Sequence, residues 1–132
     1  MTRAKPLILV VDDEGSFLEI ITAKLSAAGF DVATAKDEAE ALSRTKELMP
    51  DLVLMDIYMP PGETGTDAAL AIKQNPETKN VKIVFLTNLE DPWPTFKADN
   101  QKIAKSLGME DFLRKDQLDN LIPRVRELLA RT

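Results

Sequence analysis

The chain has 132 residues, a formal net charge of −5, and neither cysteine nor histidine. Its length corresponds to about one domain, and its composition excludes disulfides, thiol nucleophiles and metal sites built from thiolate or imidazole. The acidic balance argues against direct nucleic-acid binding, which requires a basic face, so any chemistry must use carboxylates, hydroxyls, lysines and a hard cation.

The first residues carry no targeting signal that we recognise. Residues 1–5 form a short polar tail without the apolar segment of a signal peptide, and no run approaches the roughly 20 apolar residues of a membrane span. There is also no internal repeat, low-complexity tract or linker. We therefore expect one domain over residues 6–132, located in the cytoplasm and without a membrane partner.

The first half of the chain alternates between strand and helix patterns. The apolar run at 7–11 predicts a strand buried on both faces. Apolar residues at helical spacing over 17–28, followed by a glycine, predict a helix. A strand is expected at 31–35, a helix at 38–48 and, after a Pro-Asp break, a third buried strand at 52–55.

The second half continues the alternation. A helix is expected at 66–74 and a fourth strand at 81–86. A short helix is expected at 101–107, again closed by a glycine. A fifth, less apolar strand follows at 111–114, and an amphipathic helix begins at 118. Five such alternations predict an α/β fold with a doubly wound parallel sheet covered by helices on both faces.

Polar side chains gather where the predicted strands end, which is where open parallel sheets bind their ligands. The first strand ends at Asp12 and Asp13, the third at Asp56, the fourth at Thr87, and the fifth directly precedes Lys115. Neighbouring carboxylates raise one another's pKa unless a cation balances them, and Mg²⁺ prefers such oxygen ligands. Asp56 could then attack phosphorus, with the hydroxyl and the ammonium meeting the phosphoryl oxygens.

Each of these residues also has an ordinary structural interpretation. Asp56 can be a loop aspartate, Thr87 a strand-end hydroxyl and Lys115 a surface lysine. Glu14 is best interpreted as a residue at the positive start of the first helix. The functional interpretation depends on finding several such residues together at the ends of four strands.

Together these residues resemble the receiver domains of response regulators in two-component signalling, from about residue 6 onward. Two motifs are specific: Leu-Ile-Leu-Val-Val-Asp-Asp-Glu at 7–14 and Asp-Leu-Val-Leu-Met-Asp-Ile-Tyr-Met-Pro at 51–60. The resemblance implies a CheY-like, flavodoxin-like fold: a five-stranded parallel sheet in the order 2-1-3-4-5 with five helices.

The resemblance also implies roles for individual residues. Asp56 would be the phosphoacceptor, and Asp13 and Asp56 would ligate Mg²⁺ together with the backbone carbonyl of Tyr58. Asp12 would act on the metal largely through water. Thr87 and Lys115 would bind the phosphoryl oxygens.

Phe112, three residues before Lys115, matches the aromatic residue that turns inward in the family's switch as Thr87 moves. A plain core side chain is an equal alternative for it. The chain departs from the family pattern at Asp116, where the family usually has proline, and at Asn88, where it prefers a small residue.

An insertion at 88–99 is the most individual part of the sequence. It contains Trp93 and Phe96, which could form a partner contact or a homodimer contact, because aromatic residues are enriched at interfaces. Alternatively, these aromatics fold back over the edge of the sheet.

We expect a stand-alone switch that accepts a phosphoryl group from a sensor histidine kinase or a phosphotransfer protein and then changes its binding to a downstream protein partner. It would be no enzyme beyond handling its own phosphoryl group. The alternative is an interaction scaffold that has kept the fold and lost the switch. A phosphohydrolase is disfavoured because Tyr58 stands where related hydrolases have a second aspartate. A flavodoxin is disfavoured because acidic residues after the first strand would repel a phosphate.

Overall fold

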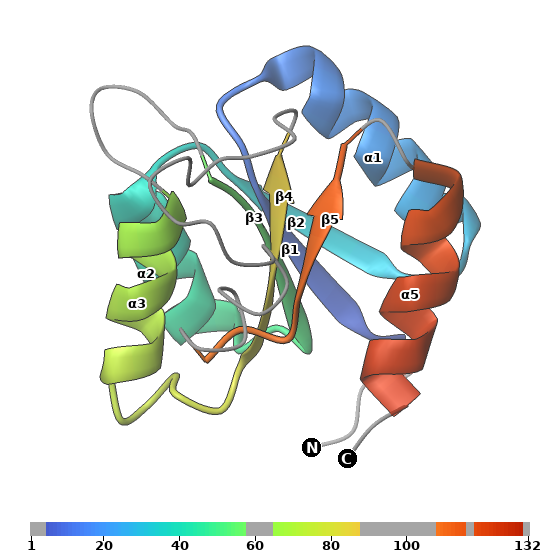
Figure 1. The fold of residues 1–132 in the computed structure, drawn as a ribbon. Helices are drawn as coiled ribbons and strands as arrows, with labels where there is room; N and C mark the ends of the chain where they lie inside the picture. Colours follow the sequence, from blue (N-terminus) through green and yellow to red (C-terminus); the bar gives the residue numbers. More distant parts are fainter. Residues whose placement is uncertain (1–4, 58–64, 88–107, 116–117, 131–132) are drawn as a thin grey trace, which may run out of the picture.

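The computed structural model describes residues 5–57, 65–87, 108–115 and 118–130. Within these ranges the chain forms five strands and four helices (Figure 1), in the order β1 (Leu7–Val11), α1 (Gly15–Ala27), β2 (Asp31–Ala35), α2 (Glu38–Leu48), β3 (Leu52–Asp56), α3 (Gly65–Gln74), β4 (Lys82–Thr87), β5 (Asp111–Arg114) and α5 (Leu118–Ala130).

The five strands form one parallel sheet in the order β2-β1-β3-β4-β5. Val11 at the end of β1 lies opposite Ala35 of β2 and Met55 of β3, so the carboxyl ends of these three strands meet at one edge. The same edge includes Thr87, the last residue of β4, which lies opposite Arg114 of β5. The predicted fold class and strand order are therefore confirmed.

Two hydrophobic layers sandwich the sheet, because side chains alternate between its faces along each strand. Helices α2 and α3 cover one face, and α1 and α5 cover the other (Figure 1). The first layer contains, among others, Leu9, Val11, Met55, Ile72 and Phe85. The second contains, among others, Ile8, Val10, Phe17, Leu54 and Val125. The continuous apolar runs in the sequence follow from this arrangement, since both faces of the central strands are buried.

The element boundaries agree with the sequence prediction to within about two residues. Several predictions fall outside the described residues: the helix at 101–107, the tail residues 1–4, Tyr58, Asn88, Trp93, Phe96 and Asp116. The structure therefore leaves these as predictions.

The two ends of α2 are defined by a side-chain cap and by a residue in the left-handed conformation. Asp37 caps α2 through its side chain, which accepts a hydrogen bond of 2.8 Å from the backbone N–H of Glu40. The same helix ends at Met49, a non-glycine residue in the left-handed conformation with φ of 47°. Glu14 occupies the N-cap position of α1, as expected, but its side chain makes no capping hydrogen bond.

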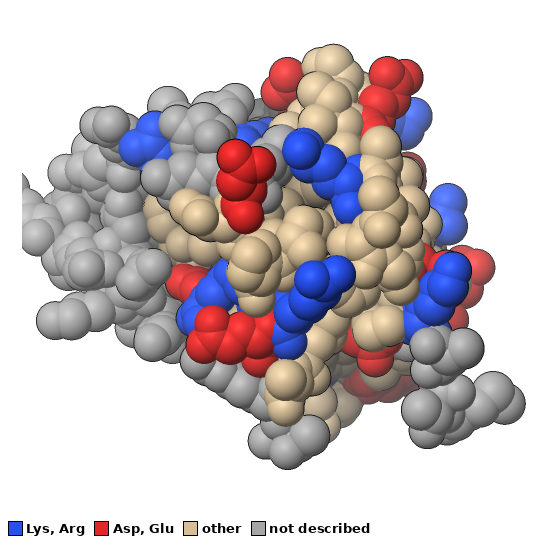
Figure 2. All heavy atoms as spheres, turned by 90° about the vertical axis from the view of Figure 1, so that its right-hand side faces the viewer, with Lys and Arg blue, Asp and Glu red and all other residues tan. Residues whose placement is uncertain are grey.

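Figure 2 shows the side of the molecule that carries α1 and α5. Acidic and basic side chains lie interspersed there around an uncharged centre, without a continuous patch of either sign among the described residues. Within the described part of the chain, no helix is both long and apolar enough to cross a membrane.

Candidate functional site

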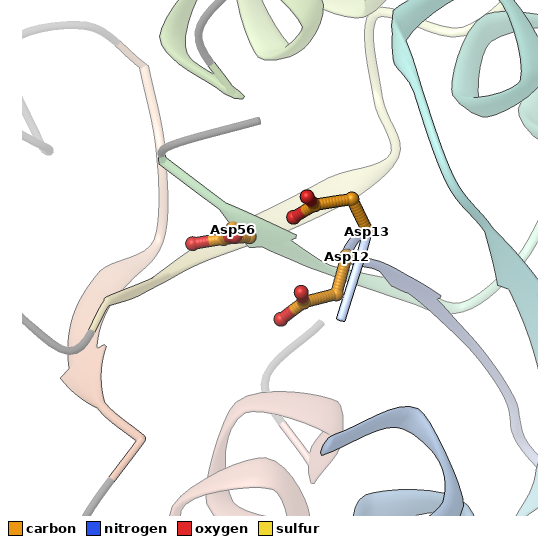
Figure 3. A group of neighbouring side chains, drawn as sticks. All are labelled: Asp12, Asp13 and Asp56. Atoms are coloured by element: carbon orange, nitrogen blue, oxygen red, sulfur yellow. The ribbon is translucent and has the colours of Figure 1, made fainter. Parts of the chain in front are cut away.

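Three aspartates lie together at the carboxyl ends of β1 and β3 (Figure 3). Asp12 and Asp13 follow β1 directly, and Asp56 is the last residue of β3. Because Val11 pairs with Met55, the parallel register makes Asp12 and Asp56 neighbours at the sheet edge. One carboxylate oxygen of each residue can be chosen so that all three lie within 4.8 Å of one another.

The three carboxylates differ in burial. Asp12 is fully buried and Asp56 is 5% exposed, whereas Asp13 is exposed. Burial raises the pKa of Asp12 from its ordinary value, although the Lys115 ammonium and the backbone N–H of Glu14 act in the opposite direction. The backbone contact is a hydrogen bond of 2.9 Å from Glu14 N to Asp12 Oδ1. A positive charge at this place would offset the free-energy cost of burying the Asp12 carboxylate.

Lys115 supplies one such charge. Its side chain is buried, its Nζ forms an ion pair with Asp12 Oδ2, and the same Nζ lies 3.4 Å from Asp56 Oδ2. The lysine comes directly after β5, which lies three places from β1 in the sheet. The structure thus brings together four residues that the sequence assigned to one site: Asp12, Asp13, Asp56 and Lys115.

The other predicted site residues are only partly described. Thr87 is in place as the last residue of β4, but its side chain lies outside the described part of the structure. Tyr58 also lies outside it. Phe112 lies in β5 opposite Phe85, is 7% exposed, and belongs to the core layer beneath α2 and α3.

Phe17 is a neighbour of the site that the sequence did not reveal. Its ring centroid lies 4.5 Å from Lys115 Nζ, within the range of a cation–π interaction. Apolar periodicity identified Phe17 only as a buried residue of the first helix, and no motif marks it.

The donor set fits a hard divalent cation. Carboxylate oxygens are the ligands that Mg²⁺ prefers, and the exposure of Asp13 leaves the cluster open to solvent on one side, so a cation could keep several waters. Asp12, Asp13 and Asp56 are the described residues that could hold it. A carboxylate cluster with a buried ammonium beside it is suited to binding a phosphoryl group and a cation together.

The chain matches the family model of the response regulator receiver domain over residues 8–126. The DNA-binding response regulator MtrA of Mycobacterium bovis is 36% identical over 134 residues, covering 99% of this chain and 54% of that protein. Response regulator PleD of Caulobacter vibrioides is 35% identical over 122 residues, covering 92% of this chain and 25% of that protein. The chain therefore spans about half or less of the length of these relatives.

A solved structure has the same fold. A putative response regulator from Chloroflexus aurantiacus superposes with a TM-score of 0.82 at 29% identity, covering 96% of this chain and 99% of that one. The family match and the solved structure agree on a receiver domain with a five-stranded parallel sheet. The chain belongs to the family of response regulator receiver domains.

Proposed function

We propose that this receiver domain accepts a phosphoryl group on Asp56 with the help of Mg²⁺ and changes its binding to a partner protein as a result. The donor would be a sensor histidine kinase or a histidine phosphotransfer protein, as is general for the family. The observation that carries the proposal is the position of Lys115, whose ammonium lies between two buried carboxylates at the sheet edge.

In this proposal Asp56 is the nucleophile, the role that the resemblance to receiver domains implies for it. In the proposed step one of its oxygens forms a bond to phosphorus while the P–N bond of the donor phosphohistidine breaks, and the departing imidazole nitrogen takes a proton. The Nζ of Lys115 lies 3.4 Å from Asp56 Oδ2, which is close enough for it to contact the phosphoryl oxygens and balance their charge. Thr87 would contact the same oxygens through its hydroxyl.

Mg²⁺ bound here would neutralise the carboxylates and the charge that develops on the phosphoryl oxygens. Asp13 and Asp56 would be direct ligands together with the backbone carbonyl of Tyr58. Asp12 would act largely through water, which agrees with its two existing contacts to Glu14 N and Lys115 Nζ. Its second oxygen would keep the lysine near the site.

The response to phosphorylation would involve Thr87 and Phe112. Phosphorylation replaces the single negative charge of the Asp56 carboxylate with roughly two charges on a phosphoryl group and would draw the Thr87 hydroxyl towards Asp56. The backbones of Thr87 and Phe112 are linked through the pairing of β4 with β5. We propose that this pairing carries the change to the face built by the two strands.

The remaining parts of the proposal concern the whole protein. We propose a single receiver domain over residues 6–132 that acts in the cytoplasm without direct nucleic-acid binding and without turnover of external substrates. Stand-alone action and a homodimer contact through Trp93 and Phe96 stay predictions of the sequence. The relative MtrA is described as DNA-binding, but this chain matches only 54% of its length. We therefore do not extend DNA binding to this chain.

The test is the uptake of one phosphoryl group. The purified protein is incubated with acetyl phosphate and Mg²⁺ and its intact mass is measured over time. We expect one phosphoryl addition in the presence of Mg²⁺, none with excess chelator, and none in Asp56→Asn. Asp31→Asn is a matched control, because Asp31 is an exposed aspartate at the start of β2, far from the site edge, and it should be modified like the wild type.

The scaffold alternative predicts a different outcome. If the wild-type protein takes up no phosphoryl group, or if Asp56→Asn takes it up undiminished, the proposed switch is wrong. Partner binding that stays the same before and after phosphorylation would favour the scaffold even if Asp56 is modified.

A further inference from the structure

The ammonium of Lys115 has an aromatic partner besides its two carboxylates. Phe17 presents its ring with the centroid 4.5 Å from Nζ, while Nζ also contacts Asp12 Oδ2 and lies near Asp56 Oδ2. The ring carries a negative quadrupole on its face, so it attracts a cation without offering a protonation site. At a buried lysine this attraction is larger than at an exposed one, because little water competes with it.

The position of the ring is set by packing that is independent of the acidic cluster. Phe17 lies in the first turn of α1, is 8% exposed, and belongs to the core layer that α1 and α5 form against the sheet. Ile21 and Leu25, at helical spacing after it, are fully buried in the same layer. The ring is therefore a fixed surface against which a long, flexible lysine can rest.

The carboxylate partners of Lys115, by contrast, change during the proposed reaction. Asp56 is converted from a carboxylate into an acyl phosphate, so the oxygens that attract the ammonium move and gain charge. Asp12 holds the ammonium from β1, on the other side of the pocket from the lysine's own strand. The ring of Phe17 is the one described partner whose position and charge distribution stay the same throughout.

We propose that Phe17 is a positioning residue for phosphoryl transfer: its ring holds the Lys115 ammonium beside Asp56 through a cation–π contact. This inference rests on the proposed function of Asp56. In the proposed role Phe17 acts on the phosphoryl group only through Lys115. Without the ring, the Lys115 side chain would populate more rotamers. Its ammonium would therefore spend less time in a position where it can contact a phosphoryl oxygen.

Fluorination of the ring separates this role from simple packing. Mono-, di- and trifluorinated phenylalanine at position 17 weaken the quadrupole stepwise while changing the shape of the ring very little. We expect the rate of Asp56 phosphorylation by acetyl phosphate, at fixed Mg²⁺, to fall stepwise by about 5- to 30-fold over the series. Phe17→Leu should show a loss of the same size, and Phe17→Tyr, which keeps an electron-rich ring, should retain the rate.

A second measurement does not depend on phosphorylation. In unphosphorylated protein with ¹³Cε-labelled lysine, the order parameter of the Lys115 Cε–H bonds should fall in the same stepwise sequence. The urea midpoint should not follow that sequence. Ile21→Val is the matched control: it removes one methylene from the same helix face and core, and should lower stability without changing the rate or the order of Lys115.

The outcomes separate the two proposals. A rate that is independent of fluorination, or a loss that Ile21→Val reproduces, overturns the role of Phe17 even if Asp56 is phosphorylated. If the wild type takes up no phosphoryl group, the proposed function is wrong, and the Lys115 order parameter alone decides about the contact. An unchanged order parameter then overturns the contact, and a stepwise fall supports it.

Discussion

Replacing Lys115 with methionine should destabilise the protein strongly, because it leaves Asp12 buried without its cation. Lys115 is 6% exposed and Asp12 is fully buried, so neither charge is well hydrated in the folded state. Removing one partner of a buried pair typically costs about 3 to 5 kcal/mol. Methionine fills a similar volume, so the loss reflects charge more than packing.

The structure also sets an upper limit to this cost. Asp12 can lose its unpaired charge by taking up a proton, and burial already raises its pKa above the ordinary value of 3.8. Protonating such a group at pH 7 costs at most about 4 kcal/mol, at 1.36 kcal/mol per pH unit. We therefore expect Lys115→Met to lower the free energy of unfolding by about 3 to 4 kcal/mol in the presence of a chelator.

Urea unfolding followed by circular dichroism at pH 7 measures this loss. Lys24→Met, at an exposed lysine in the last turn of α1, is the control and should change the free energy by less than about 0.5 kcal/mol. Asp12→Asn should restore most of the stability of Lys115→Met, since it removes the unpaired charge. Mg²⁺ should stabilise Lys115→Met more than the wild type, because ammonium and cation compete for the same carboxylates.

Two results would refute this reasoning. The first is a Lys115→Met protein no less stable than Lys24→Met, which would mean that the ion pair with Asp12 contributes nothing. The second is equal stabilisation of Lys115→Met and wild type by Mg²⁺, which would mean that the cation does not bind the carboxylates that Lys115 contacts.

Four further substitutions test other parts of the fold by the same unfolding assay. Arg124→Met should cost about 2 to 4 kcal/mol, because Arg124 Nε lies 2.5 Å from Oδ2 of the buried Asp111, whereas loss of the exposed partner in Glu127→Gln should cost less than about 0.5 kcal/mol. Met49→Gly should stabilise by about 1 kcal/mol, since φ of 47° favours glycine, and a Met49→Gly protein no more stable than wild type would contradict this. Asp37→Ala should cost about 1 kcal/mol through loss of the α2 cap, and an unchanged midpoint would contradict that.

The strands and most of the acidic site could be predicted because their signals are local. A central parallel strand is buried on both faces, so β1 and β3 appear in the sequence as uninterrupted apolar runs. Parallel strands also end at one edge of the sheet, so a polar residue directly after each run is already placed. These two local signals were enough to predict the positions of Asp12, Asp13 and Asp56.

The contacts of Lys115 could not be predicted in the same way. Lys115 follows β5, three places along the sheet from β1, and whether its side chain reaches Asp12 depends on the twist of the sheet and on side-chain packing. The ring of Phe17 reaches the same ammonium from α1, whose rotation about its axis is set by the whole core layer. The pairing of Asp111 with Arg124 likewise depends on how α5 lies over β5. Such contacts arise between segments that no local pattern connects.

The central claim is that Asp56 itself carries the phosphoryl group. The most direct measurement is borohydride reduction of protein treated with acetyl phosphate and Mg²⁺, followed by peptide mass spectrometry, because reduction converts an aspartyl phosphate into homoserine. We expect homoserine at position 56 and at neither position 12 nor position 13, and only when Mg²⁺ is present. Homoserine at Asp12 or Asp13, or at no position, would contradict it.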